Sequence, residues 1–175
     1  MEQIRHNKQG MRLRHAAAGT LLMLCSAFTQ AGEPAMFTGT WSVTWCDTAR
    51  PDQACGGFTV HLLQQHSRLC GSHSGATPNL SRLDEGGDQS IVGTVIGDTA
   101  VLAIRSGRND SIHLVTARRH SGAVDWQLTD TVLKSDSDTE VIPTTEKLNK
   151  ATEAFHAQGF DAAQQACLKR WHTAR

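Results

Sequence analysis

Cysteine is the residue type whose number and spacing constrain the chemistry of this chain most strongly. Of five cysteines, Cys25 lies in an apolar N-terminal stretch, and the other four are Cys46, Cys55, Cys70 and Cys167. An even number of cysteines in an exported chain predicts disulfide bonds, because exported proteins fold in oxidising compartments. The alternative use, a zinc site, is disfavoured because these four cysteines contain no Cys-x-x-Cys spacing.

The order of the expected strands selects one pairing among the three that four cysteines allow. Cys46 ends the first expected strand and Cys55 precedes the second, so a hairpin would set their side chains opposite each other. This leaves Cys70, on the third expected strand, for Cys167 near the C-terminus. We therefore predict the bridges Cys46–Cys55 and Cys70–Cys167. The second bridge requires Cys70 to point outward, opposite to Leu69.

The histidines are the next candidates for metal or catalytic chemistry. Of nine histidines, two precede residue 32, and the others are His61, His66, His73, His113, His120, His156 and His172. His61 and His113 fall inside expected strands and would share a face if those strands were neighbours. Their spacing matches no metal-ligand pattern, and a histidine on the polar face of a strand is ordinarily solvated. We therefore expect no metal ion and no other cofactor.

Sequence motifs of hydrolases and phosphate-binding enzymes are missing. There is no Gly-x-Ser-x-Gly, no His-Glu-x-x-His and no phosphate-binding loop. The adjacent carboxylates Asp84 and Glu85 have no identifiable partner for glycosidase chemistry. No catalytic residue is predicted, and an enzyme whose site is assembled from distant residues stays an alternative.

Two groups of charged residues are candidates for binding. Arg82, Asp84 and Glu85 lie in the irregular stretch 75–89. This stretch is interpreted either as a lid or contact loop over one barrel mouth, or as a solvated connection pinned down by two leucines, Leu80 and Leu83. The second group is Arg118 and Arg119, followed by His120 at a strand end. It would either hold an anion or line the barrel rim in water.

Short strands are the elements that must position these residues. In the stretch 41–46, apolar residues alternate with Ser, Thr and Cys, and 58–62 alternates in the same way. Two-residue turn signals stand at His66-Ser67 and Gly97-Asp98. Further strands are expected at 90–96, 100–106, 111–118 and 123–129, with Val141-Ile142 as a short eighth.

The spacing of these strands indicates the fold class. Strands that recur about every eight to twelve residues, with no helical segment between them, are typical of antiparallel neighbours. We therefore predict a mainly β fold, an antiparallel up-and-down barrel of seven or eight strands followed by a C-terminal two-helix appendage.

The first strand opens with Gly39-Thr40-Trp41, a Gly-x-Trp at a strand start. This placement resembles the calycin group of small β-barrels, which includes lipocalins, avidins and certain bacterial metalloprotease inhibitors. The resemblance covers the first strand, and the next two in pattern only. It implies that Trp41 closes one end of the barrel. Another antiparallel barrel or a sandwich is the alternative fold.

The tail after Pro143 reads as two short helices. Thr144 or Thr145 would cap the first, and its apolar stripe is Leu148, Ala151 and Phe155. Gly159 would interrupt the helical run. Asp161 would cap the second helix, whose buried stripe is Ala163, Cys167 and Trp171.

The N-terminal stretch reads as a secretory signal peptide. A basic start precedes the apolar run 16–28, and a small-residue cleavage site ends at Ala31. Met11 is an alternative start. A lipid anchor on Cys25 is disfavoured because Leu24 precedes it. The expected division is a signal peptide over 1–31, a β-barrel domain over 32–143 and a helical segment over 144–175.

Charge and composition reduce the number of partner classes to be considered. Residues 32–175 keep 13 of the 17 basic and 16 of the 17 acidic residues, a net charge of about −3. This argues against nucleic acid and anionic membranes as partners. The chain has no Tyr and five Phe, which favours a filled barrel that binds through its loops.

The functional prediction is a periplasmic or secreted, non-catalytic protein that recognises a protein partner through barrel loops, as an inhibitor would. The alternatives are carriage of a small apolar ligand inside the barrel and a hydrolase.

Overall fold

A computed structural model describes residues 36–135, 141–151 and 154–173. Its strands are β1 (Gly39–Trp45), β2 (Gly56–Gln65), β3 (Arg68–Ala76), β4 (Leu83–Glu85), β5 (Ile91–Ile96), β6 (Thr99–Arg105), β7 (Ile112–His120), β8 (Ala123–Leu133) and β9 (Thr145–Lys150). A short 3-10 helix, η1 (Pro78–Leu80), precedes β4, and the α-helix α1 (Ala154–Thr173) follows β9. No helix among the described residues is both long and apolar enough to cross a membrane.

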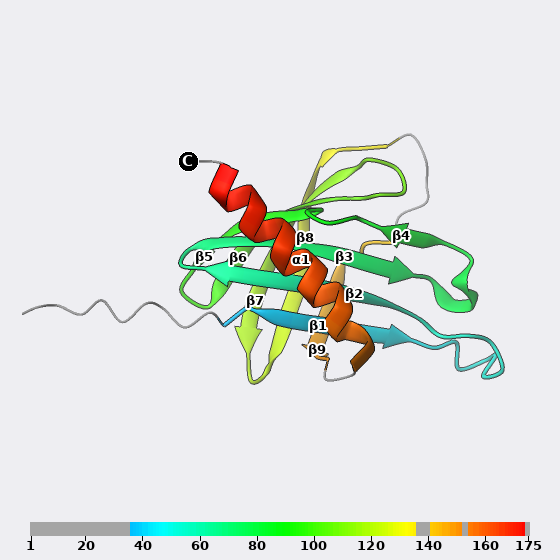
Figure 1. The fold of residues 1–175 in the computed structure, drawn as a ribbon. Coiled ribbons are helices and arrows are strands. Elements are labelled where there is room, and N and C mark those ends of the chain that lie inside the picture. Colours follow the sequence, from blue (N-terminus) through cyan, green and yellow to red (C-terminus); the bar gives the residue numbers. More distant parts are fainter. Residues whose placement is uncertain (1–35, 136–140, 152–153, 174–175) are drawn as a thin grey trace, which may run out of the picture. The chain divides into compact units, whose positions relative to one another are not determined.

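Eight of the strands form a closed antiparallel barrel (Figure 1). Around the barrel the order is β1, β2, β3, β5, β6, β7, β8 and β9, and β9 pairs with β1 to close the ring. The short strand β4 pairs with β3 outside this ring. Because each barrel strand pairs with the next one along the chain, the predicted up-and-down barrel is confirmed.

Alternating residues of the strands fill the barrel interior. The largest fully buried side chains are Trp41, Trp126, Phe37, Phe58, Leu62, Leu69, Ile91, Leu102, Ile104, Leu148, Val60 and Val115. They belong to one continuous cluster in which the rings of Phe58 and Trp126 meet edge to face, 5.2 Å between centroids. An eight-stranded barrel is just wide enough for side chains to fill it. The interior is therefore a packed core.

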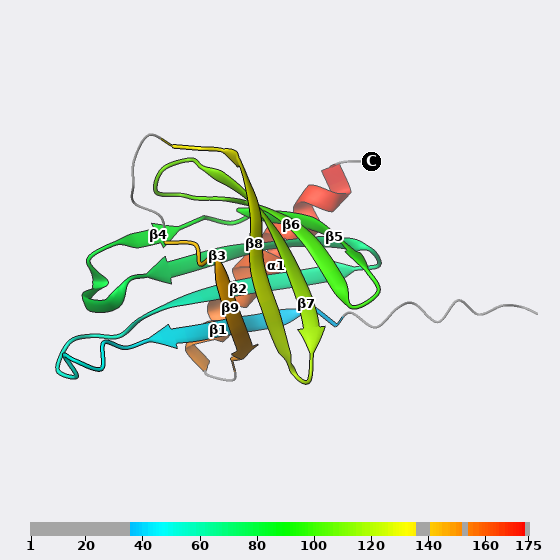
Figure 2. The same cartoon turned by 180° about the vertical axis from the view of Figure 1, so that it is seen from behind.

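The two ends of the barrel differ in the length of their connections. At one end, β2–β3, β5–β6 and β7–β8 are joined by the two-residue turns 66–67, 97–98 and 121–122. We call this the short-loop end. At the other end, the long-loop end, lie the connections 46–55, 77–90 and 106–111. Residues 134–135 and 141–144, between β8 and β9, lie there too, and 136–140 are outside the described residues. Figure 2 shows the β1–β2 connection and β4 on the same side of the barrel.

Trp41 seals the short-loop end. Its ring is fully buried, and its Nε1 donates to the Phe37 carbonyl at 2.8 Å. The guanidinium of Arg119 and the amine of Lys150 lie 4.3 and 4.8 Å from the ring centroid. Gly39 has φ +133°, and a Cβ there would stand 2.6 Å from Lys150 Nζ. Glycine is favoured at this position because a φ of +133° is a backbone conformation that other residues rarely adopt.

The segment Val141–Ile142 plugs the long-loop end. Both side chains are buried, and Ile142 joins the barrel core. Trp126 Nε1 donates to the Pro143 carbonyl at 3.1 Å, which fixes the segment across the interior. The expectation that Val141-Ile142 forms the eighth strand is wrong, because β9 takes that place.

The expected first helix is also wrong. Residues 145–150 form β9, which pairs with β8 over five residues and with β1 over two, so they belong to the barrel. One helix, α1, follows and continues through Gly159 without interruption. A Cβ on Gly159 would stand 2.5 Å from His61 Nε2. This glycine therefore allows close approach of helix and sheet and does not end the helix.

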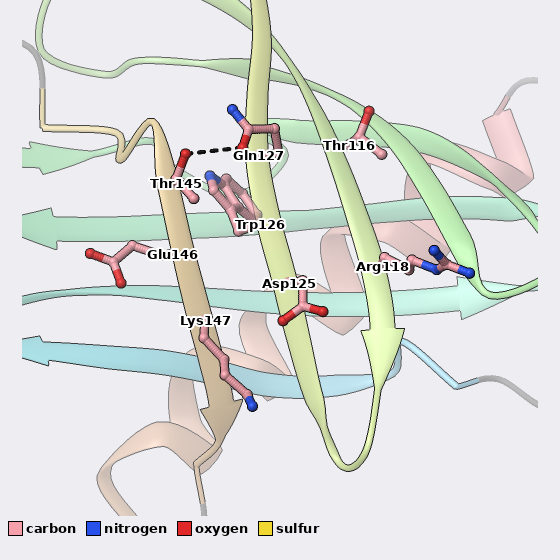
Figure 3. A pocket seen from close by; sticks show the side chains of 8 residues that line it. All are labelled: Thr116, Arg118, Asp125, Trp126, Gln127, Thr145, Glu146 and Lys147. Atoms are coloured by element: carbon pink, nitrogen blue, oxygen red, sulfur yellow. Dashed lines mark hydrogen bonds between the residues drawn. The ribbon is translucent and has the colours of Figure 1, made fainter.

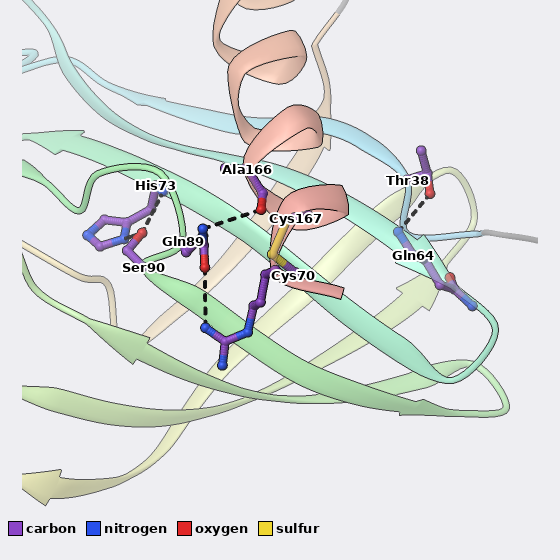
Figure 4. The surroundings of a disulfide bond; sticks show 9 residues. Thr38, Gln64, Cys70, His73, Gln89, Ser90, Ala166 and Cys167 are labelled. Carbon is purple, nitrogen blue, oxygen red and sulfur yellow. Dashed lines mark hydrogen bonds between the residues drawn. A yellow bond between two sulfur atoms is a disulfide. The ribbon is translucent and has the colours of Figure 1, made fainter. Parts of the chain in front are cut away.

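Both predicted disulfides are present. Cys46–Cys55 closes the β1–β2 connection, and Cys70–Cys167 ties α1 to the outer face of β3 (Figure 4). As predicted, Cys70 points away from the barrel core, and it is buried with Leu63, Cys167 and Trp171 in a separate cluster. Arg68 lies over the Trp171 ring at 5.0 Å.

Candidate functional site

The long-loop end is rigid at the β1–β2 connection. Cys46–Cys55 closes it covalently, and inside it the Asp47 carboxylate accepts bonds from Ala49 N and from the Arg50 guanidinium. These bonds, the one from Arg50 above all, lower the pKa of Asp47. The connection therefore presents a fixed shape to solvent.

A compact turn over 77–82 lies against this connection. Thr77 organises it, because its Oγ1 bonds the Ser81 hydroxyl and the Arg82 amide, and its main chain bonds Arg82 and Leu80. The amide of Asn79 donates to the Ala54 carbonyl at 2.8 Å. The two connections are therefore joined by the main chain.

The tip of this turn has an unusual backbone. Asn79 and Leu80 have φ values of 61° and 52°. Asparagine tolerates the left-handed region, but a residue such as leucine pays about 1–2 kcal/mol there. Such strain persists only where surrounding bonds enforce it, and it clusters at functional sites.

The leucines of this turn face solvent. Leu80 is 52 % exposed and Leu83 is 51 % exposed, so the interpretation that they pin the loop down is wrong. Val132 and Leu133, at the end of β8, are also exposed. Four large apolar side chains are therefore exposed at this end of the barrel.

Asp84 has the opposite placement and is 1 % exposed. Its carboxylate accepts bonds from Ser106 Oγ at 2.6 Å and Gly107 N at 2.8 Å, and His73 Nε2 lies 3.4 Å away. Burial acts to raise the pKa of Asp84, but the nearby His73 ring and the hydrogen bond from Ser106 outweigh it, so the pKa is lowered. Asp84 thus fastens β4 to the β6–β7 connection.

His73 extends this network to Ser90. Its Nδ1 lies 2.8 Å from Ser90 Oγ and its Nε2 faces Asp84, so the three residues follow the order of a hydrolase triad with the two ring nitrogens exchanged (Figure 4 shows Ser90 and His73). Ser90 is 7 % exposed, and a Cβ on Gly86 would stand 2.3 Å from its Oγ. The Ser90 hydroxyl is therefore buried and lies against the backbone of Gly86. The network of Ser90, His73 and Asp84 therefore has a structural role, which is to hold neighbouring segments of this end together.

The sequence-based candidates are divided between the two ends. Arg82 and Glu85 are exposed at the long-loop end, beside the buried Asp84. Arg118 and Arg119 lie at the opposite end, where β7 finishes. Arg118 bonds Asp98 at 3.0 Å, and Arg119 stacks on Trp41 and donates to the Ala123 carbonyl. The structure therefore does not bring the five residues into one site.

Three histidines are buried, against the expectation that the strand histidines are solvated. His61 Nδ1 bonds Thr40 Oγ1 beneath α1, and the His113 ring lies between Ser111 and Thr131. His73 is the third. Across the described ranges, no three His, Cys, Asp or Glu side chains are grouped so as to hold a metal ion.

A shallow trough of about 440 Å³ lies on the outer face of β7, β8 and β9 (Figure 3). Two cross-strand rows line it: Thr116, Gln127 and Thr145, and Arg118, Asp125 and Lys147. Thr145 Oγ1 donates to Gln127 Oε1 at 3.0 Å. The trough is on the outside of the sheet and does not reach into the barrel.

Sequence reasoning missed the features that distinguish the long-loop end. Arg108 was not singled out, the burial of His73 was not expected, and Leu80 and Leu83 were named but expected to pack down. The Pro78-Asn79 pair is a turn signal that marks the tip, but no local signal marks the burial of Asp84.

No protein-family model, no curated protein and no solved structure matches the chain.

Proposed function

We propose that this chain is an exported, non-catalytic binding protein that recognises a protein partner through its long-loop end. The observation that carries the proposal is the packed interior, sealed by Trp41 at one end and by Val141 and Ile142 at the other. Because the interior is filled, the outer surface of the barrel is what is left for binding a partner.

The long-loop end has the properties of a protein-binding surface. Its connections are cross-linked by a disulfide, by Asn79 N to Ala54 O and by the Asp84 network, so little conformational entropy is lost on binding. It exposes large apolar side chains together with arginines, a composition enriched in interface cores. Two disulfides also fit an oxidising compartment.

The inhibitor-like form of the proposal rests on the resemblance to calycin-like metalloprotease inhibitors. Gly39 and Trp41 carry that resemblance, and the burial of Trp41 at a barrel end supports it. In this form the partner is a secreted zinc endopeptidase.

Photo-cross-linking in the source cell tests the proposal. A photoreactive residue would replace Arg50 or Lys134 at the long-loop end, and Ile96 at the short-loop end as the matched control. We expect a defined protein adduct from the first two positions and none from Ile96. Adducts from Ile96 alone, or none at any position, would contradict the proposal.

The purified chain then tests the inhibitor form and both alternatives. Stoichiometric loss of activity of a secreted bacterial zinc endopeptidase supports inhibition. An apolar compound extracted at one equivalent per chain would favour carriage instead. Hydrolysis of model esters that is lost in Ser90→Ala would favour an enzyme.

A further inference from the structure

We infer that Leu80 is the anchor of the long-loop end, and that with Leu83 it enters an apolar pocket rimmed by carboxylates on the protein partner. This rests on the proposed function and goes beyond it by assigning the anchoring residue and the chemistry of the partner's site.

The backbone at Leu80 is the first reason for choosing this residue. A left-handed φ of 52° suits glycine or asparagine, yet the chain places a leucine there. The side chain is not buried in return, because it is 52 % exposed. A strained backbone that carries an exposed apolar side chain is explained by a contact made outside this chain.

The rigid setting of the tip is the second reason. Leu80 N donates to the Thr77 carbonyl at 2.9 Å, and Asn79 N ties the tip to Ala54 at 2.8 Å. On the far side, the Thr77 amide donates to Arg82 O at 3.0 Å. Hot spots of an interface lie in well-packed pockets near its centre, and a side chain whose backbone is already fixed loses less conformational entropy when it is buried there.

Two arginines flank the leucines and define the partner's charge. Arg108 Nη1 donates to the Leu83 carbonyl at 3.2 Å, and Arg82 precedes Leu83. Within the described ranges neither guanidinium forms an ion pair, in contrast to Arg50, Arg105 and Arg118, which pair with aspartates. Guanidinium groups prefer carboxylates in bidentate geometry, so the rim of the partner's pocket carries Asp or Glu.

Other exposed apolar residues lack this combination. Ile96 is the most exposed of the large apolar side chains in the described chain, but it lies beside the Gly97-Asp98 turn at the short-loop end. Its φ is not in the left-handed region. It therefore serves as the matched control.

Binding of the partner recovered by cross-linking tests the inference. Purified wild type, Leu80→Gly, Leu80→Asn and Ile96→Ser would be compared by surface plasmon resonance and thermal unfolding. We expect Leu80→Gly and Leu80→Asn to weaken binding at least tenfold without lowering the unfolding temperature, because both residues tolerate the left-handed backbone. Ile96→Ser should change affinity less than twofold.

The arginines are tested by salt. Arg82→Gln and Arg108→Gln should each slow association and flatten its dependence on ionic strength. Wild-type affinity in both Leu80 variants would overturn the inference while leaving the proposed function intact. A partner that turns out to be a second copy of this chain, or a salt dependence unchanged by the arginine variants, would overturn the acidic rim. Failure to recover any partner would remove the proposed function and this inference together.

Discussion

The two ends of the barrel use the same kinds of side chain for opposite purposes. At the short-loop end, arginine and lysine lie over Trp41 and seal the core. At the long-loop end, Arg82 and Arg108 make no ion pair among the described residues, and leucines face water beside them. The two ends also differ in buried polar groups, because the network of Asp84, Ser106 and His73 lies at the long-loop end.

The length of the connections explains this difference. Two-residue turns satisfy their own main chain, so the side chains at that end are free to cover the core. Longer connections leave amides to be satisfied, and Asp84, Ser106 and Thr77 accept bonds from them. Loops held in this way can expose apolar residues without collapsing onto the core, which is the reason for proposing that end as the binding surface.

The largest effect is expected from the disulfide that ties α1 to the side of the barrel, away from both ends. Replacing Cys70 and Cys167 together by serine opens a bridge of sequence separation 97, which corresponds to about 4.7 kcal/mol in the chain-entropy model. We expect α1 to become sensitive to proteolysis while the β-sheet signal in circular dichroism stays. Loss of the sheet signal would show that the helix is needed for the barrel itself.

The next prediction removes Asp84, the buried carboxylate that holds connections of the long-loop end together. Asp84→Ala leaves Ser106, Gly107 and His73 without their buried partner, and we expect a loss of about 2–4 kcal/mol in the free energy of unfolding. Urea denaturation measures it. The neighbouring Glu85→Ala, which is exposed, is the control and should cost less than about 0.5 kcal/mol. Equal effects of the two changes would contradict the fastening role.

Acid should act on the same network. The pKa of Asp84 is lowered in the folded chain, so its carboxylate contributes stability that is present above the unfolded pKa, near 3.8, and is lost as the pH falls below it. Hydrogen exchange at decreasing pH should therefore show the amide of Gly107 losing protection below about pH 4. In Asp84→Asn this pH dependence should disappear, and its persistence would assign the effect to another carboxyl.

A smaller effect is expected at the short-loop end. Arg119→Gln removes one of the two cations beside the Trp41 ring and the bond to the Ala123 carbonyl, at a cost of about 1 kcal/mol. Unfolding by urea with Trp fluorescence measures it. Partner binding should be unchanged, because this end is outside the proposed surface. Weakened binding would place the surface at the wrong end.

The smallest effect on stability is expected at Leu80, where a substitution should raise stability but weaken binding. Leu80→Gly relieves a left-handed leucine, worth about 1–2 kcal/mol, against a cost of about 0.4–1 kcal/mol for the greater freedom of glycine when unfolded. We expect a net gain of about 0.5 kcal/mol in urea denaturation. A clear loss would mean that Leu80 contributes to packing in the free chain.

Most of the strands and both disulfides were predictable from the sequence. Alternation along a strand and two-residue turns are local signals, and they placed β5, β6 and β7 to within two residues at each end. β9 was mistaken for a helix because Glu, Lys and Leu favour helices locally. Its conformation is decided by the open edges of β8 and β1, whose hydrogen bonds it completes.

The sequence by itself determined the barrel, the pairing of the cysteines and the placement of Trp41 at a strand start, because each depends on residues close together or on a short list of alternatives. Only the tertiary structure decided that Asp84 is buried while Arg82 and Glu85 face water, and that Leu80 is exposed. Alternation cannot indicate these placements in an irregular segment, since burial there depends on contacts with Ser106, Gly107 and Ala54 from distant parts of the chain. The division of the charged residues between the short-loop end and the long-loop end is likewise a property of the closed barrel.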